Sequence, residues 1–277
     1  MLDRHFWRRH AGLPALVFVL FATVAAGTGL DESFARAWAF DPVTRHFIGS
    51  GAGEWWAKEL IHSKGGLLIR ILGGLLVLVW ALSFRIGALR RWRRPAGYVV
   101  LSVALGAGAV GLLKQLTNVD CPWSLAEFGG RLPYVHLFAD RPDSLPRAQC
   151  FPGGHSSSGF ALFALYFLTL GRSRRLARWA LGGALLVGGV FAFGQEARGA
   201  HFLSHDLWSA ALVWFTCVGV YAIGYRGNVW EVGDMPNLAL RDQEVRSCSA
   251  KLGMSPITQP STRSPSQPAP SGPHPAS

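Results

Sequence analysis

The sequence predicts an all-α integral membrane protein whose six transmembrane helices form a bundle. Half of its 277 residues are hydrophobic and only 16% are charged. Apolar runs alternate with short arginine-rich segments, a pattern typical of polytopic helical membrane proteins. The formal net charge of +11 does not indicate a nucleic-acid partner, because the arginines lie in short clusters between the apolar runs. The sequence leaves the oligomeric state open.

Six apolar segments are predicted to cross the bilayer. Their approximate bounds are 12–30, 65–84, 97–116, 158–170, 179–197 and 207–225. The first also fits a signal peptide with a cleavage site near residues 23–26, but its length favours a retained helix. Arg70, in the second, is expected to snorkel to the interface rather than face a polar site. The fourth is short and is expected to begin at His155. Ser204 is the expected N-cap of the sixth.

Polar connections complete the predicted organisation. Residues 31–64 mix charged side chains with tryptophans and are expected to lie as amphipathic helix on the outer surface. Residues 117–155 form the longest connection, and long structured loops between spans often carry function. The membrane domain is therefore expected over 1–225. A cytoplasmic tail covers 226–277, and its Pro- and Ser-rich part from about residue 255 is expected to be disordered.

Arginine clusters set the predicted topology. They lie at the N-terminus, at 85–94 and at 172–178, all on one side of the predicted membrane. By the positive-inside rule that side is cytoplasmic, so six spans place both termini inside. The same count places Lys114, the loop 117–155 and the turn 198–206 together on the outer side. Three separate segments are therefore predicted to bring ionisable side chains to one membrane face.

The segment 151–159 has the composition of an anion site. Gly153 and Gly154 precede a helix start, where backbone N–H groups can converge on an oxyanion. His155 can move a proton near neutral pH, and Ser156 follows it. Taken alone, the segment is equally typical of a helix cap with a surface histidine.

The turn 198–206 adds four further ionisable groups: Arg198, His201, His205 and Asp206. Each one alone fits an interfacial anchor or a helix cap. Their predicted convergence with Lys114 and His155 at one membrane face favours a catalytic site that acts on a phosphate.

Two of the four cysteines, Cys121 and Cys150, lie in the outer loop. If that side is an oxidising periplasm, they can pair, and the alternative is two free thiols. A bridge that closes about 30 residues contributes roughly 3 kcal/mol by the loop-entropy model. Cys217 and Cys248 are expected to remain thiols.

Three blocks carry the polar residues in order: Lys114, six residues, Cys121-Pro122; then Pro152-Gly153-Gly154-His155; then Gly194-Gln195, five residues, His201, three residues, His205, with Asp206 one place later. In order, spacing and membrane side they resemble the type 2 phosphatidic acid phosphatase superfamily, which shares its site with vanadium haloperoxidases. That family has Lys, six residues, Arg-Pro; Pro-Ser-Gly-His; and Ser-Arg, five residues, His, three residues, Asp. The resemblance covers about residues 12–225.

The sequence departs from the family pattern at several positions. Cys121 replaces the arginine of the first block, and Gly153 replaces the serine of the second, for which Ser156 is a substitute. Gln195 replaces the arginine of the third block, and Arg198, three residues later, can supply that guanidinium. His205 holds the position of the orienting acid, whereas Asp206 is chemically better suited to hold an imidazole.

The resemblance implies a lipid phosphatase. His201 would attack phosphorus to form a phosphohistidine, and His155 would protonate the leaving group and then activate water. Lys114, Arg198 and the Gly153-Gly154 backbone would neutralise the equatorial oxygens, with no metal or other cofactor. The implied location is a bacterial inner membrane with the site facing the periplasm. Candidate substrates are undecaprenyl diphosphate, phosphatidic acid, phosphatidylglycerol phosphate and the lipid A phosphates.

Three alternatives stay open at this point. A lipid phosphotransferase would use the same residues. The spacing of His201 and His205, with His155 and Asp206 nearby, also fits a metal-dependent membrane hydrolase. The changed positions also fit an inactive relative of the family. A transporter is disfavoured, because the ionisable residues cluster at one face and only Arg70 intrudes in mid-span.

Overall fold

The computed structural model describes residues 2–137 and 139–230, and these residues are mostly helical. Contacts divide the chain into two units, Met1–Glu231 and Val232–Ser277. The second unit, which holds the tail predicted to be disordered, lies outside the described residues. The α-helices are α1 Arg4–Trp7, α2 Leu13–Thr28, α3 Leu30–Phe34, α4 Gly66–Leu82, α5 Arg93–Thr117, α6 Gly154–Phe160, α7 Phe163–Leu170, α8 Arg174–Ala197 and α9 Leu203–Gly219.

Short segments of other types join these helices. The π-helical segments are η1 Arg8–Gly12, η2 Ala35–Ala39, η4 Trp55–Gly65 and η8 Val220–Gly224. The 3₁₀ segments are η3 Gly51–Gly53, η5 Gly87–Trp92, η6 Pro122–Ser124 and η7 Ala126–Phe128. Strands β1 Phe40–Asp41 and β2 His46–Phe47 form an antiparallel hairpin in which Phe40 pairs with Phe47. Residues 31–64, predicted as amphipathic helix, are therefore helical segments interrupted by this hairpin.

Five continuous helices in the described chain are long and apolar enough to cross a membrane. They are Arg4–Ala25, Gly51–Leu82, Gly87–Ser124, Arg174–Ala197 and Leu203–Gly224. The helical class is thus confirmed, but the predicted fourth span, 158–170, is not one helix. It is divided between α6 and α7, because the Leu162 N–H bonds to the Gly159 carbonyl at 3.2 Å, three residues back, and the regular α-helical ladder is interrupted there.

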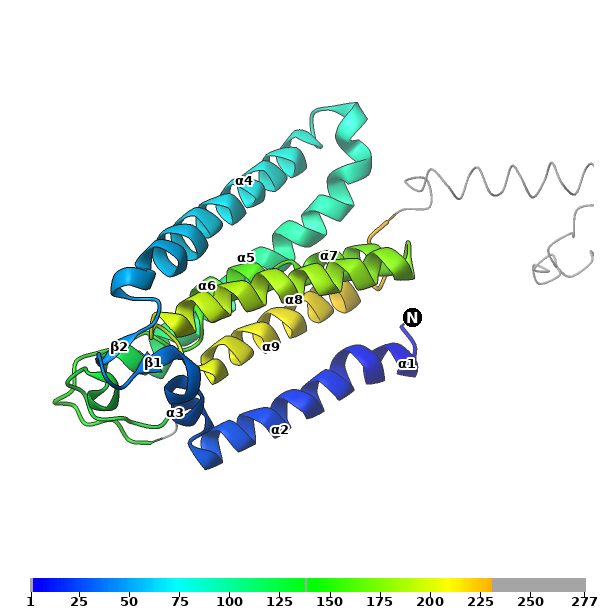
Figure 1. Cartoon of the computed structure of the whole chain (residues 1–277). Helices are drawn as coiled ribbons and strands as arrows, with labels where there is room; N and C mark the ends of the chain where they lie inside the picture. Colours follow the sequence, from blue (N-terminus) through cyan, green and yellow to red (C-terminus); the bar gives the residue numbers. More distant parts are fainter. Residues whose placement is uncertain (1, 138, 231–277) are drawn as a thin grey trace, which may run out of the picture. The chain divides into compact units, whose positions relative to one another are not determined.

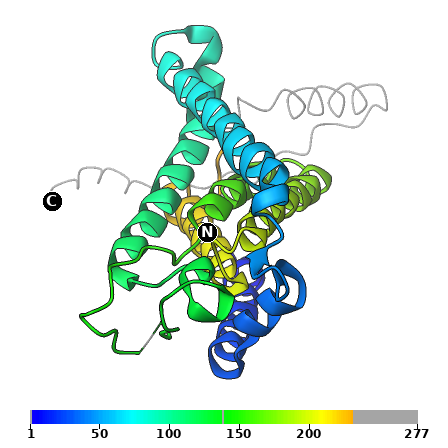
Figure 2. The ribbon, with the colours of Figure 1, turned by 60° about the vertical axis from the view of Figure 1, so that its left-hand side comes forward.

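Helices α6 and α7 occupy the interior of the bundle. Both contact α5, α8 and α9, as Figures 1 and 2 allow the reader to follow. The approach to α8 is close, since a Cβ atom at Gly159 would lie 2.8 Å from Gly188 Cα. Figure 1 also shows the N-terminus and the α4–α5 and α7–α8 connections at the opposite end of the bundle from the β1–β2 hairpin and the loop after α5.

An apolar cluster supports the end of the bundle that carries the long loop. Its buried members are Ala35, Ala39, Phe47, Leu125, Phe128 and Phe202. It joins η2 and the hairpin to the loop and to the residue that follows His201. A buried ion pair holds the rest of the loop, with Arg141 Nη1 2.5 Å from Asp120 Oδ2 and Arg141 Nη2 3.1 Å from Asp120 Oδ1. The site residues of this loop are therefore supported by side chains from several elements.

Candidate active site

Lys114 lies in the last turn of α5, where the helix ends at Asn118 in the left-handed conformation. Its Nζ donates to the carbonyls of Gln149 at 2.9 Å and Cys150 at 3.4 Å. A Cβ atom at Gly154 would lie 3.0 Å from Lys114 Cε, so the lysine stem rests against the first residue of α6. The first two sequence blocks are thus adjacent.

Cys121 and Cys150 form a disulfide with their Cα atoms 5.2 Å apart. The bridge joins the residue after Asp120 to the segment that leads into α6. Because the Cys150 carbonyl also accepts from Lys114, the bridge and the lysine hold the same stretch of backbone. Within the described residues, Cys217 is a free, buried thiol.

The start of α6 is bonded to α9. The Gly153 N–H donates to the His205 carbonyl at 3.1 Å, and Ser209 Oγ donates to the Gly153 carbonyl at 2.7 Å. The Gly153 N–H, expected to face the phosphate, is therefore already engaged within the protein. Of the two glycines proposed for phosphate binding, Gly154 is the one that lies against Lys114.

Asp206 lies against the start of α6. Ser156 Oγ donates to Asp206 Oδ1 at 2.5 Å, and both side chains are buried. A Cβ atom at Gly153 would collide with Asp206 Oδ1. The hydroxyl predicted to contact the phosphate and one oxygen of the carboxylate predicted to orient His201 are therefore bonded to each other.

His201 and His205 lie in the turn between α8 and α9 and in the first turn of α9. Their ring centroids are 5.8 Å apart, and the Nδ1 atoms of both rings are buried without a hydrogen-bond partner. Burial, with His205 and Lys114 nearby, holds the pKa of His201 well below its ordinary value. The His201 ring is therefore neutral near pH 7, which is the form that a nucleophile requires.

His155 lies on α6 between two aromatic neighbours. Its ring stacks on Phe191 of α8 with centroids 4.2 Å apart and lies 4.5 Å from the ring of His62 in η4. Its Nε2 atom is buried and has no hydrogen-bond partner. Gly66 also faces this ring, since a Cβ atom there would lie 3.1 Å from His155 Cε1 and 3.5 Å from Arg70 Nη1. Arg70, although exposed, thus extends back along α4 to Gly66, beside the polar cluster.

Arg198 follows α8 directly, and its side chain turns back along the helix. Its Nη1 donates to Gln195 Oε1 at 2.9 Å, and its guanidinium carbon lies 5.9 Å from the Trp123 ring. The Gln195 Nε2 atom in turn lies 2.6 Å from His62 Nδ1. The structure therefore brings Gln195 and Arg198 into contact, as their three-residue separation suggested.

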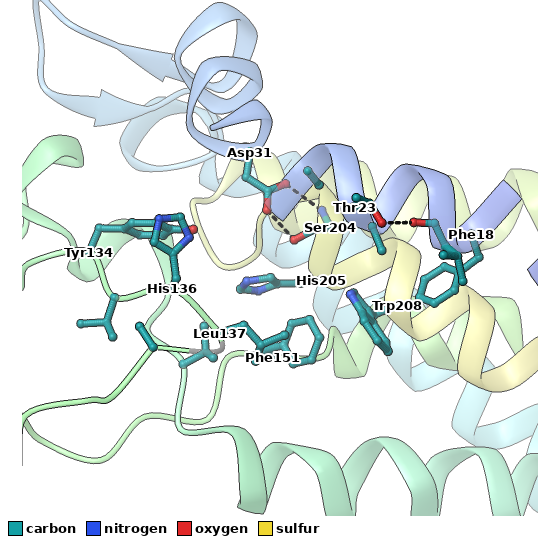
Figure 3. A pocket seen from close by; sticks show the side chains of 16 residues that line it. Phe18, Thr23, Asp31, Tyr134, His136, Leu137, Phe151, Ser204, His205 and Trp208 are labelled. Carbon is teal, nitrogen blue, oxygen red and sulfur yellow. Dashed lines mark hydrogen bonds between the residues drawn. The ribbon is translucent and has the colours of Figure 1, made fainter. Parts of the chain in front are cut away.

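A cavity of about 760 Å³ lies between α2, the start of α9 and the long loop. Its lining is mostly apolar, with Phe18, Phe151 and Trp208 among the larger side chains. Figure 3 shows the His205 ring reaching into it. At its polar end, Asp31 accepts hydrogen bonds from the N–H and the hydroxyl of Ser204. Ser204 therefore bonds to Asp31 and does not cap α9, whose N-cap is Phe202.

Residues 95–228 match the family model of the PAP2 superfamily. This match, over slightly less than half of the chain, supports its membership of the PAP2 superfamily. This confirms the resemblance to type 2 phosphatidic acid phosphatases, and membership indicates phosphatase activity on phosphate esters. Comparisons with curated proteins and with solved structures gave no match. The match includes all three blocks, whereas α2, η4 and α4 lie outside it.

Two departures from the PAP2 pattern have a physical explanation in this chain. At position 153 the Asp206 carboxylate occupies the space that a serine side chain would need. At position 195 the glutamine bonds to Arg198, so a guanidinium is held near the family's arginine position by a different residue. The described residues contain no group of three or more His, Cys, Asp or Glu side chains arranged to bind a metal ion.

Proposed function

We propose that this PAP2 protein is a membrane lipid phosphatase that hydrolyses a lipid phosphomonoester or diphosphate through a phosphohistidine. The observation that carries the proposal is the convergence of Lys114, His155 and His201 from three separate segments at one end of the bundle. His155, His201 and His205 there each have a buried ring nitrogen without a partner. Buried polar atoms normally have partners, so such a cluster is suited to bind a ligand that supplies them.

In this mechanism His201 is the nucleophile. One of its ring nitrogens attacks phosphorus, forming a P–N bond as the P–O bond to the lipid breaks. His155 Nε2 donates a proton to the leaving oxygen and then accepts one from the water that hydrolyses the phosphohistidine. Lys114 and Arg198 stabilise the charge on the equatorial oxygens in both steps.

The proposed membrane placement has six crossings, with α6 and α7 together forming the fourth. Gly154 to Leu170 would rise about 25 Å as a helix, close to the hydrocarbon thickness of roughly 30 Å. The arginine-rich connections lie at the end of the bundle opposite the site (Figure 1). By the positive-inside rule, both termini are then cytoplasmic and the site faces the periplasm of a bacterial inner membrane.

The cavity beside His205 supports a lipid as the substrate. Its α2 wall is apolar, and the neighbouring α2 side chains Leu16, Val17 and Leu20 are exposed, as expected of a surface that meets lipid. We assign the cavity to the apolar part of the substrate, with the phosphate on the Lys114 side of His205. Phosphatidic acid, phosphatidylglycerol phosphate, undecaprenyl diphosphate and the lipid A phosphates all satisfy this description.

Phosphate release tests the proposal. Purified full-length protein in detergent, with EDTA present, is incubated with each of these four lipids, and His201→Ala and His155→Ala are measured in parallel. We expect release from at least one lipid by wild type and none by either variant. Activity that appears only after metal is restored would overturn the mechanism. Appearance of a phosphorylated lipid instead of free phosphate would assign the chain as a phosphotransferase.

A further inference from the structure

His62 lies outside the region that matches the PAP2 superfamily, yet it contacts two of the site residues. It belongs to η4, an 11-residue π-helical segment that leads into α4. Its ring lies 4.5 Å from the ring of His155, and its Nδ1 lies 2.6 Å from Gln195 Nε2. Segments of π-helix are rare in proteins overall, but those that occur are often found at functional sites.

The hydrogen bonds of Gln195 fix the chemical state of His62. A guanidinium can only donate, so the atom that Arg198 Nη1 contacts at 2.9 Å is the amide oxygen. The other end of the amide is then its NH₂ group, which donates to His62 Nδ1. That nitrogen must offer a lone pair, and the ring proton therefore lies on His62 Nε2. The order His62, Gln195, Arg198 is a directed chain of hydrogen bonds.

The first two positions of the third block, both of which depart from the family pattern, face η4. Gln195 replaces the family's arginine and bonds to His62. Gly194 replaces the family's serine, and a Cβ atom there would lie 2.8 Å from Ile61 Cγ2. Gln195 gives His62 of η4 a hydrogen-bond partner, and Gly194 leaves the space that η4 needs to approach α8. The two departures are therefore explained by a single feature.

We propose that His62 is a positioning residue that holds Gln195, and through it the Arg198 guanidinium, toward the phosphate of the substrate. Arginine has a long and flexible side chain, so a fixed acceptor reduces the conformational freedom that is lost when it binds an anion. In the family pattern the arginine is at position 195, whereas here the guanidinium comes from Arg198. His62, from another helix, restricts the positions that this guanidinium can adopt. This inference rests on the proposed function, in which Arg198 binds phosphate.

Binding of orthovanadate, a phosphate mimic, tests the inference without turnover. Calorimetry on the full chain in detergent would compare wild type with His62→Ala, His62→Asn, Gln195→Ala and the double variant His62→Ala/Gln195→Ala. Asparagine can place Oδ1 where His62 Nδ1 lies. His46→Ala, which removes an exposed histidine of β2, is the matched control. Thermal unfolding of each variant checks that it folds.

We expect His62→Ala and Gln195→Ala each to raise the Kd for orthovanadate about tenfold, the scale of one charge-assisted hydrogen bond. The double variant should bind no more weakly than either single variant, because both remove the same support. His62→Asn should stay within about threefold of wild type.

The role of His62 would be overturned if folded His62→Ala bound orthovanadate as tightly as wild type. It would also be overturned if the losses of binding free energy of the two single variants added in the double variant. If wild type binds orthovanadate but releases phosphate from no lipid, the proposed function fails and the positioning role is still decided by these Kd values. If wild type does not bind orthovanadate, both proposals are overturned.

Discussion

Ser156 and Asp206 form a buried hydrogen bond between α6 and α9, with 2.5 Å between Ser156 Oγ and Asp206 Oδ1. The contact lies against Gly153, where a Cβ atom would be 2.5 Å from the same Ser156 oxygen. The carboxylate that the sequence offered as a partner for His201 thus joins two helices. It also explains why the position that carries serine in the PAP2 pattern is a glycine in this chain.

Gly153→Ala is expected to destabilise the protein and abolish most of its activity. The added methyl group collides with Asp206, and overpacking of this kind costs typically 1–3 kcal/mol. Gly182→Ala in α8 is the matched control, because a Cβ atom there has nothing within 4 Å. Thermal unfolding and phosphate release would be measured for both. Equal behaviour of the two variants would show that Asp206 does not occupy this space.

Ser156→Ala is expected to lower stability more than catalysis. Its hydroxyl bonds to Asp206, and its loss leaves a buried carboxylate oxygen without its partner, which costs about 1–3 kcal/mol. Since the hydroxyl is engaged in this way, the KM for a lipid phosphate should change less than threefold. The measurement is kcat/KM beside thermal unfolding. A large rise in KM at unchanged stability would instead assign Ser156 to the phosphate.

Removal of the disulfide should weaken both the loop and the site. By the loop-closure model, loss of the Cys121–Cys150 bridge costs about 3 kcal/mol. The Cys150 carbonyl, which accepts from Lys114, is then less well fixed, so KM should rise. Cys121→Ser and Cys150→Ser would be compared with Cys217→Ser, which removes a thiol outside the site. Unchanged KM and thermal stability in the first two variants would contradict this account.

The pH dependence follows from the burial of His201. Its lowered pKa means that the ring stays neutral as pH falls through the ordinary value of 6.5. Loss of activity from His201 protonation should therefore occur well below pH 6.5, as read from kcat/KM after correction for the ionisation of the substrate phosphate. Stability also decreases as pH falls, but its loss begins at a higher pH. The unfolded chain takes up a proton at His201 below about pH 6.5 and the folded protein does not, so folding weakens as pH decreases below that value. An acidic limb for His201 centred at or above pH 6.5 would contradict the burial argument.

The sequence was sufficient to predict which segments meet. Helix length and arginine clusters decide which loops share an end of the bundle, and they predict that Lys114, His155 and His201 lie at the same end. Side-chain partners were less predictable, because they depend on neighbours distant in sequence. Ser204 looks like a helix cap from its local context, yet its hydroxyl bonds to Asp31, 173 residues earlier. For the same reason, no local pattern distinguishes His62 from the other polar residues of 31–64.

The division of the fourth predicted span also lies beyond local sequence patterns. Hydropathy identifies 158–170 as apolar, but it does not show where the regular α-helical hydrogen bonds are interrupted.

Trapping the covalent intermediate tests the central claim most directly. Wild type, His155→Ala and His201→Ala would be mixed with a ³²P-labelled lipid phosphate in EDTA, quenched in alkali and digested for mass spectrometry. The account predicts an acid-labile, alkali-stable phosphate on the peptide that contains His201, and none in His201→Ala. Turnover without this label, or a label that persists in His201→Ala, would contradict it.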